Sequence, residues 1–290
     1  MENGIVKITL RRARQEDREN VVKVESGATP NLSYLAKVFD MFLNEKRGAF
    51  LVAEVDGKLV GCGKFTIMPD GSAWLESLRV LPEYQGVGIG KGFYNEFFNI
   101  ARTQDVTTMR MYTGVKNAVS KGLAEKFGFR VSAAYRGALL PCPTEPDRDS
   151  TDTFRQVTDP DRATTILMPF FEKWTGFLVM NRTFFALNPA LCRNLAEQGW
   201  VYEDPNNRSV MTLGARFMPE QALHIGVFGG DAEACLKFAA KKGATGSAQR
   251  LSCLFPPSAV DLQNILTQNG FRFEASDFIV MTVNSGSSPG

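Results

Sequence analysis

A glycine-rich turn between an apolar segment and an amphipathic one is the part of this chain best suited to chemistry. Gly86, Gly88 and Gly90 follow the apolar residues 74–80, and the segment beginning near Gly90 carries an apolar stripe with helical spacing. A helix N-terminus has unpaired N–H groups and a partial positive charge, so a phosphate binds there readily. Glycine lets the backbone approach that phosphate because no Cβ intervenes. The pattern predicts a site for a phosphate-bearing ligand.

Two common phosphate motifs do not fit this turn. A P-loop has two glycines separated by four residues and then Lys and a hydroxyl residue, whereas three residues separate Gly86 from Gly90, and Gly92 follows Lys91. A dinucleotide fingerprint spaces its glycines as Gly-x-Gly-x-x-Gly, whereas here they fall at every second position. A third pattern, Gln/Arg-x-x-Gly-x-Gly/Ala, remains.

That third pattern is present at Gln85, Gly88 and Gly90, and it follows a Val-x-Pro formed by Val80 and Pro82. It resembles motif A of the GNAT superfamily, the acyl-CoA-dependent N-acyltransferases. Further along, residues 117–130 are similar to the motif B of the same superfamily. The matching positions are Asn117, Leu123, Lys126, Gly128 and Phe129. An ordinary strand-turn-helix unit is the alternative interpretation.

The resemblance implies a fold, a co-substrate and a set of contacts. The fold is α/β (α+β), with a mixed, mostly antiparallel sheet flanked by helices. The co-substrate is acetyl-CoA, whose pyrophosphate would bind the turn while its pantetheine arm pairs with the backbone of the preceding strand. The predicted cofactor-binding residues are Leu78, Arg79, Val80, Gln85, Gly86, Val87, Gly88, Ile89, Gly90, Lys91 and Asn117. No metal is expected, because the lone His224 excludes a site with two histidine ligands.

One position departs from the family pattern. The Tyr that often protonates the leaving thiolate falls on Ala124, and such an acid typically contributes ~10²–10⁴-fold in rate. A thiol with a pKa of ~8.5 is still a tolerable leaving group in water. Tyr112 and Tyr135, on neighbouring predicted strands, are candidates to replace the acid. Two possibilities stay open: an enzyme that uses another acid or water, and a CoA-binding domain with weak or lost turnover.

Glu76 is the predicted catalytic residue. An amine that attacks a thioester must lose a proton, so a carboxylate near the middle of the strand is a suitable base. Strand alternation places Glu76 on one face with Trp74, Leu78 and Val80. A surface position, or a role in binding the ammonium group of the acceptor, is the alternative. The aromatic residues that either line an acceptor pocket or belong to the core are Trp74, Phe65 and Tyr34.

Length and composition limit the remaining possibilities. The 290 residues are enough for two domains, and 44% apolar residues supply a core for each. With 33 basic against 31 acidic residues and no basic run, nucleic acid is not an expected partner. Without a signal layout or a long apolar stretch, no membrane partner is expected and the protein is predicted to be cytoplasmic. Five cysteines lack a C-x-x-C spacing and are interpreted as reduced thiols.

The chain carries an internal repeat. Gly230 and Gly270 are separated by the same number of residues as Gly88 and Gly128, and each second glycine of these pairs precedes Phe. The downstream copy lacks the Gln/Arg-x-x-Gly-x-Gly pattern, and the carboxylate of Asp231 would repel a pyrophosphate. We interpret Asp231 as a helix N-cap and the copy as a second, degenerate GNAT-like domain. Chance similarity between two α/β segments is the alternative.

The predicted domains follow chain order. They are a catalytic GNAT acetyltransferase domain at 1–138, a linker at 139–152, a degenerate GNAT-like domain at 153–283 and a disordered tail at 284–290. The predicted activity is N-acetyl transfer from acetyl-CoA to a primary amine of a small molecule or peptide, by direct attack on the thioester. A non-catalytic acyl-CoA-binding or regulatory module is the alternative. No recognisable motif encodes the acceptor, the length of the acyl chain or the oligomeric state. A homodimer is left open.

Overall fold

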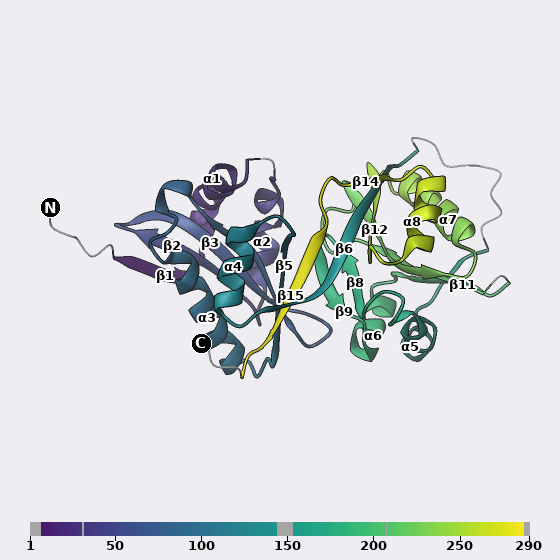
Figure 1. Ribbon diagram of the computed structural model, residues 1–290, viewed down its shortest axis with the longest axis horizontal. Coiled ribbons are helices and arrows are strands. Elements are labelled where there is room, and N and C mark those ends of the chain that lie inside the picture. The colour runs from purple at the N-terminus through teal and green to yellow at the C-terminus, as the bar shows by residue number, and fades with distance from the viewer. Residues whose placement is uncertain (1–6, 31, 144–152, 207, 287–290) are drawn as a thin grey trace. The chain divides into compact units, whose positions relative to one another are not determined.

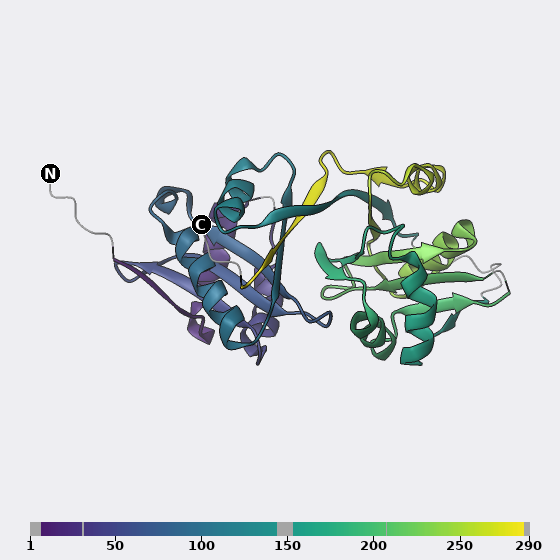
Figure 2. The ribbon, with the colours of Figure 1, turned by 60° about the horizontal axis from the view of Figure 1, so that its bottom comes forward.

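The computed structural model describes residues 7–30, 32–143, 153–206 and 208–286. The chain divides into two compact units, and neither unit is continuous in sequence. The first consists of Met1–Met111, Val119–Arg130 and Thr282–Gly290, and the second of Tyr112–Ala118 and Val131–Met281. Figures 1 and 2 show the elements of each unit in two views.

The first unit is built on a sheet of mostly antiparallel strands. Its strands are β1 Ile8–Arg12, β2 Ala49–Val55, β3 Lys58–Ile67, β4 Ala73–Val80 and the start of β5 Thr108–Gly114. Strands β1 to β4 pair antiparallel in chain order, and β4 pairs parallel with β5. Its helices are η1 Gln15–Asp17, α1 Arg18–Ala28, α2 Leu35–Asn44, η2 Pro82–Tyr84, α3 Ile89–Thr103 and α4 Ala118–Lys126. The predicted mixed, mostly antiparallel sheet flanked by helices is confirmed.

Helices cover both faces of this sheet. On one face, Phe93 and Phe97 of α3 fill the space above Gly61 and Gly63 of β3, which have no side chains of their own. On the other face, α1 contacts β3 and β4, while aromatic rings of α2 pack edge-on against Phe50 of β2. Because β2 and β3 are buried from both sides, their sequences are almost continuously apolar or small. The sheet is the middle layer of a three-layer unit.

The second unit repeats this plan. Its elements are β6 Arg130–Pro141, β7 Arg155–Gln156, α5 Pro160–Leu167, η3 Met168–Phe170, β8 Phe177–Met180, β9 Thr183–Ala186, α6 Pro189–Glu197, β10 Val201–Asp204, β11 Ser209–Gly214, β12 Ala222–Gly229, α7 Ala232–Thr245, β13 Arg250–Phe255, α8 Val260–Gln268, β14 Arg272–Phe273 and most of β15 Phe278–Asn284. Strands β7, β10, β11 and β12 pair antiparallel, and β12 pairs parallel with β13 after the crossover helix α7. The first unit has the same crossover in β4, α3 and β5.

Each unit includes a final strand from the other half of the chain. Strand β6 follows α4 in sequence, but from Val131 it belongs to the second unit, where it pairs antiparallel with β13. From Thr282 the last strand, β15, belongs to the first unit. Just beyond it, Ser285 N donates to Thr107 O at 2.9 Å and Ser285 Oγ to Val106 O at 2.5 Å. Each unit is therefore assembled from separate segments of the chain, whereas each predicted domain is one continuous segment.

Several boundaries differ from the predicted ones. Strand β6 ends at Pro141, three residues into the predicted linker, and linker residues 144–152 lie outside the described residues. Residues 272–284 form two strands, β14 and β15, and Glu274 N, just after β14, donates to Gly137 O of β6 at 2.9 Å. Of the predicted tail, 287–290 also lie outside the described residues. Where the chain is described, none of its helices is both long and apolar enough to cross a bilayer.

Candidate functional site

The glycine turn joins β4 to α3 and forms the N-terminus of that helix. After β4 the chain makes the short helix η2, and Gly86 and Gly88 then take φ values of 83° and 101°. Residues other than glycine rarely adopt such values. A Cβ built on either glycine would meet nothing within 4 Å, so backbone conformation rather than crowding requires glycine here. The space above the turn is open to a ligand.

The next two glycines serve packing instead. A Cβ on Gly90 would lie 2.9 Å from Leu123 Cδ2 of α4, and one on Gly92 would lie 3.0 Å from Leu10 Cδ1 of β1. The expectation that Gly90 clears a path for phosphate is therefore wrong, because its missing side chain faces α4. Only Gly86 and Gly88 keep the turn open.

The turn carries the charge distribution that an anion requires. Helix α3 has 15 residues, and its first N–H groups, from Ile89 onward, have no acceptor within the helix. Lys91 is exposed on its first turn and adds an ammonium group. Gln85 Nε2 donates to Val80 O at 3.0 Å, which fastens the turn to the end of β4. A diphosphate fits this arrangement of donors and positive charge.

Strand β4 has a bulge in its second half, before η2 and the turn. The register pairs Glu76 with Lys64 and Arg79 with Cys62, so β4 has one residue more than β3 between these pairs. The extra residue is Ser77, which has a φ of 57° and is buried. A bulge bends its strand and increases the local twist. Cys62 Sγ, 3.6 Å from Ser77 O, donates to that carbonyl.

Strand β4 also separates from β5, starting just before the bulge. The parallel register pairs Ala73 with Met109 and Trp74 with Arg110, and in the first unit it does not extend to Leu75 and Met111. The predicted pantetheine-binding residues, Leu78, Arg79 and Val80, lie in this separated part of β4. Two carbonyls there already accept hydrogen bonds at 3.0 Å: Leu78 O from Arg79 Nη1 and Val80 O from Gln85 Nε2.

The bulge changes which side chains share a face. Leu78 Cδ1 lies over Gly63 on the α3 face, whereas Glu76 lies on the face covered by α1 and α2. The prediction that Glu76 shares a face with Leu78 and Val80 is wrong, because one extra residue at Ser77 reverses the alternation beyond it. Its place beside Trp74 stands, since both precede the bulge.

Glu76 is a buried carboxylate held by a hydroxyl group. It is 8% exposed, and Thr66 Oγ1 donates to Glu76 Oε1 at 2.6 Å. Its cross-strand neighbour Lys64 is fully buried and is ion-paired with Glu45. Glu76 therefore lies in a buried place where Thr66 fixes its carboxylate.

Tyr34 brings a hydroxyl group to the bulge, a contact that the sequence did not indicate. Tyr34 occupies the N-cap position of α2, and its hydroxyl oxygen is 2.6 Å from Ser77 Oγ. The buried carboxylate of Glu25 accepts the main-chain N–H groups of Tyr34 and Leu35 at 3.1–3.2 Å. Burial raises the pKa of Glu25. The one available signal was Glu25 itself, an acidic residue next to Val24 on the buried side of α1.

The other aromatic candidates are core residues. Trp74 and Phe65 are almost completely buried, and Phe65 packs on Phe97 of α3 with ring centroids 6.1 Å apart. Among the three, only Tyr34 combines partial exposure with a polar contact to the bulge.

Residues 13–129 match the family model described as acetyltransferase (GNAT) family. This part of the chain is a GNAT acetyltransferase domain. It contains the glycine turn, the bulge and Glu76.

Solved structures extend the similarity of fold to the whole chain. A GCN5-related N-acetyltransferase from Sphaerobacter thermophilus is 10% identical, with a TM-score of 0.64 over 98% of this chain and 96% of that one. One from Kribbella flavida is 14% identical, with a TM-score of 0.54 over 97% and 72%. A tandem GNAT protein from the clavulanic acid biosynthesis pathway is 13% identical, with a TM-score of 0.58 over 97% and 100%. Comparison with curated protein sequences gives no match.

The position that often carries the catalytic acid in the GNAT superfamily is not accessible to solvent in this domain. Ala124 is fully buried in α4. Tyr135 belongs to the second unit, where it donates to Trp174 O, is fully buried and has a pKa raised by that burial. It is therefore not available as an acid for the GNAT domain. Tyr112 and Asn117 lie in the segment Tyr112–Ala118 of the second unit, and Asn117 directly precedes α4.

The GNAT-like second unit has a different helix end at the corresponding place. Asp231 accepts the N–H of Ala234 at 3.0 Å and so caps α7, as expected from the sequence. Its carboxylate occupies the end of the helix where an anion would bind. His224 lies buried in β12, and burial lowers its pKa to about 3.

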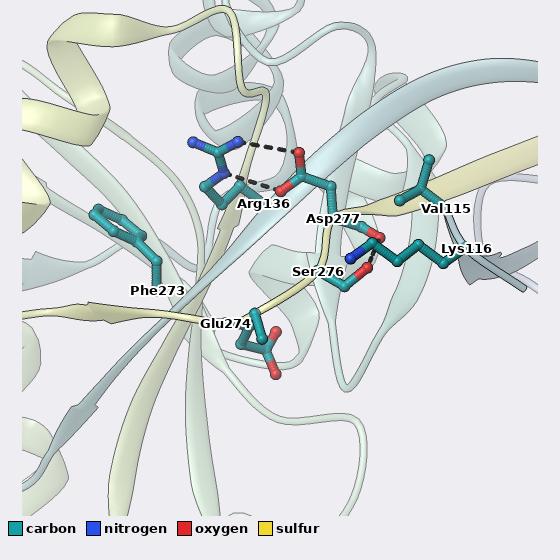
Figure 3. Close-up of a pocket in the computed structure, with 8 residues that line it drawn as sticks. Val115, Lys116, Arg136, Phe273, Glu274, Ser276 and Asp277 are labelled. Carbon is teal, nitrogen blue, oxygen red and sulfur yellow. Dashed lines mark hydrogen bonds and ion pairs between the residues drawn. The ribbon is translucent and has the colours of Figure 1, made fainter.

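A cavity of about 380 Å³ is present in the second unit, away from this helix end. Its lining residues are Val115, Lys116, Arg136, Phe273, Glu274, Ala275, Ser276 and Asp277. Figure 3 shows Arg136 facing Asp277, with ion-pair distances of 2.9 and 3.1 Å. Glu274 is likewise ion-paired with Arg182. Both carboxylates are thus already neutralised. Elsewhere too, no group of three or more His, Cys, Asp or Glu in the described residues could hold a metal ion.

Proposed function

We propose that this protein is an N-acetyltransferase that moves the acetyl group of acetyl-CoA to a primary amine of a small molecule or peptide. The family match supports acyl transfer. The observation that carries the proposal is the separation of β4 from β5 after Trp74, on the strand that leads through η2 into the open glycine turn. A parted strand and an anion-binding turn in succession suit a long ligand with a diphosphate at one end.

The residues present fit acetyl-CoA, which supplies a thioester when bound. The open space above Gly86 and Gly88 and the N–H groups at the start of α3 would hold the pyrophosphate, with Lys91 adding charge. The backbone of residues 78–80 would pair with the pantetheine amides. Asn117, at the start of α4, stays a predicted contact.

Glu76 would accept the proton of the attacking amine. Its carboxylate is on the face of the sheet covered by α1 and α2, and Thr66 orients it. The amine nitrogen then forms a bond to the acetyl carbon directly. Cys62 of β3, which contacts the bulge, is a poor nucleophile for an acyl-enzyme because burial raises its pKa to about 12.

A non-catalytic acyl-CoA-binding or regulatory module is the alternative raised by Ala124, and the comparisons do not favour it. Thiol release from acetyl-CoA with a panel of primary amines separates the two. For the acetyltransferase, at least one amine should accelerate release, and Glu76→Gln should lower kcat by about 10²–10⁴-fold. CoA affinity should stay unchanged, because Glu76 is not part of the turn.

Gly88→Val is the matched variant for the cofactor site. A β-branched residue at a φ of 101° would distort the turn, so CoA binding measured by calorimetry should be lost while the thermal unfolding midpoint changes little. CoA binding without turnover on any amine would support the non-catalytic module. Unchanged CoA affinity in Gly88→Val would refute the assignment of the turn.

A further inference from the structure

In the proposed acetyl transfer, the sulfur that leaves must take up a proton, and the residue that donates this proton is not yet assigned. When the bond between the acetyl carbon and sulfur breaks, the sulfur departs as a thiolate, and the family position for its acid is Ala124. That residue is fully buried and has no proton to give. The following inference rests on the proposed function and concerns the group that replaces this acid.

The bulge in β4 brings the residue after the proposed base into contact with a second hydroxyl group. Ser77 follows Glu76 directly, and its Oγ is 2.6 Å from the hydroxyl oxygen of Tyr34. The pairing of β4 with β5 has ended at Trp74, so this hydroxyl pair lies next to the separated part of β4. This is the part of the strand that is proposed to take the thioester end of acetyl-CoA.

Tyr34 is held in this position through its main chain. Its N–H and that of Leu35 both donate to the buried carboxylate of Glu25, which fixes the start of α2 against α1. A second link joins the C-terminal end of α1 to β4, because Arg79 Nε donates to Thr29 Oγ1 at 3.1 Å. The tyrosine ring is therefore carried on a fixed backbone, as a catalytic group requires.

We propose that Tyr34, hydrogen-bonded to Ser77, is the acid of the transfer reaction. The amine nitrogen bonds to the acetyl carbon and its proton goes to Glu76, while the carbon–sulfur bond breaks and its electron pair goes to sulfur. The phenolic proton of Tyr34 passes to that sulfur and gives CoA thiol. The phenolate regains a proton from the Glu76 carboxylic acid through water. The net change is one amide and one thiol from one amine and one thioester.

The charged groups of the elements around the hydroxyl pair have partners of their own. Glu76 and Arg79 of β4 lie one and two residues from Ser77, where Glu76 accepts from Thr66 and Arg79 donates to Thr29. Cys62 of β3 donates to Ser77 O. Ser77 would donate to a transient phenolate of Tyr34. Glu25 is directed at the main chain of Tyr34 and not at its hydroxyl.

The test is the pH profile of kcat, measured by thiol release with an amine that the wild type acetylates. A tyrosine acid with a pKa of ~10 gives the wild type a falling limb at alkaline pH. Tyr34→Phe should lower kcat by about 10²-fold and abolish that limb, with CoA affinity within about threefold of wild type. Ser77→Ala should lower kcat less and shift the limb. Glu76→Gln should lower kcat and keep the alkaline limb.

Tyr202→Phe, in β10 of the second unit, is the matched control and should leave the whole profile unchanged. A Tyr34→Phe variant that keeps the alkaline limb would overturn this inference alone, even if kcat falls, because a structural defect lowers every point of the curve. Loss of the alkaline limb in Tyr112→Phe, with the limb kept in Tyr34→Phe, would overturn it as well. A wild type that binds no CoA or acetylates no amine would overturn the proposed function, and this inference with it.

Discussion

At the scale of single residues, buried charges in the first unit are held by specific partners rather than left to solvent. Arg11 of β1 donates to both oxygens of Asp17, at 2.7 and 2.8 Å, and Arg14 N donates to Asp17 Oδ2 at 2.7 Å. The hydrogen bond from Arg11 lowers the pKa of Asp17. This carboxylate closes the start of η1, the short helix that leads directly into α1.

Asp17→Asn should therefore destabilise the protein in a pH-dependent way. The folded pKa of Asp17 is below its unfolded value, so the stabilisation is complete above about pH 4 and is lost as pH falls through the folded pKa. At pH 7 the variant should lose about 1.5–3 kcal/mol, as for hydrogen bonds to charged groups. Urea unfolding from pH 7 down to acidic pH measures both quantities.

The matched control for Asp17 is Asp40→Asn, which removes an exposed ion pair with Arg18. Exposed pairs contribute little, so this loss should be the smaller one. Two outcomes would contradict the assignment. One is an equal loss of unfolding free energy in both variants. The other is a loss in Asp17→Asn, relative to wild type, that does not become smaller towards acidic pH.

At the scale of elements, the alternating glycines divide into two kinds. Gly86 and Gly88 are required by positive φ, whereas Gly90 and Gly92 are required by the close approach of α4 and β1. The same sequence repeat thus makes the turn open and lets the helix behind it pack closely. Substitutions should separate these two uses.

Gly90→Ala should destabilise the fold and leave the conformation of the turn intact. Its new Cβ would meet Leu123 Cδ2 at 2.9 Å, and overpacking of this kind typically costs about 1–3 kcal/mol. Leu123→Ala removes the clashing atom, so the double variant should be more stable than the sum of the single effects by about 0.5–3 kcal/mol. Denaturant unfolding of the four proteins gives this coupling. Strictly additive losses would show that Gly90 does not contact α4.

At the scale of the whole molecule, each unit contains a strand, or part of one, that is contributed by the other half of the chain. Strand β6 leaves the first half for the second unit, and the end of β15 returns to the first. Folding of either unit therefore needs residues that are distant in sequence, which raises the contact order of each.

A chain that stops at Asp277 should fail to fold cooperatively. It lacks β15, whose buried side chains are Ile279, Val280, Met281 and Val283. Each such side chain contributes about 1.5–3 kcal/mol, and together they approach the total stability of a domain, about 5–15 kcal/mol. Calorimetric unfolding and CoA binding are the measurements, with a chain ending at Gly286 as the control. Retained cooperative unfolding in the shorter chain would show that the units are independent of β15.

The sequence by itself determined the glycine turn, the helix after it and the second copy. These depend on local properties: the φ freedom of glycine, the periodicity of apolar residues and the capping by Asp231. The mostly antiparallel sheet was implied by the resemblance to the GNAT superfamily. Glu76 was chosen because an attacking amine needs a base near the middle of this strand, and its role stays a proposal.

Only the tertiary structure decided the face of Glu76, the contact of Tyr34 with Ser77 and the exchange of final strands. One extra residue in β4 reverses its alternation, and nothing in the residue types around Ser77 distinguishes a bulge from a regular strand. Tyr34 and Ser77 meet because α2 is fixed over the bulge by the buried Glu25. Such contacts depend on cross-strand register and on packing between distant segments, which local sequence patterns do not encode.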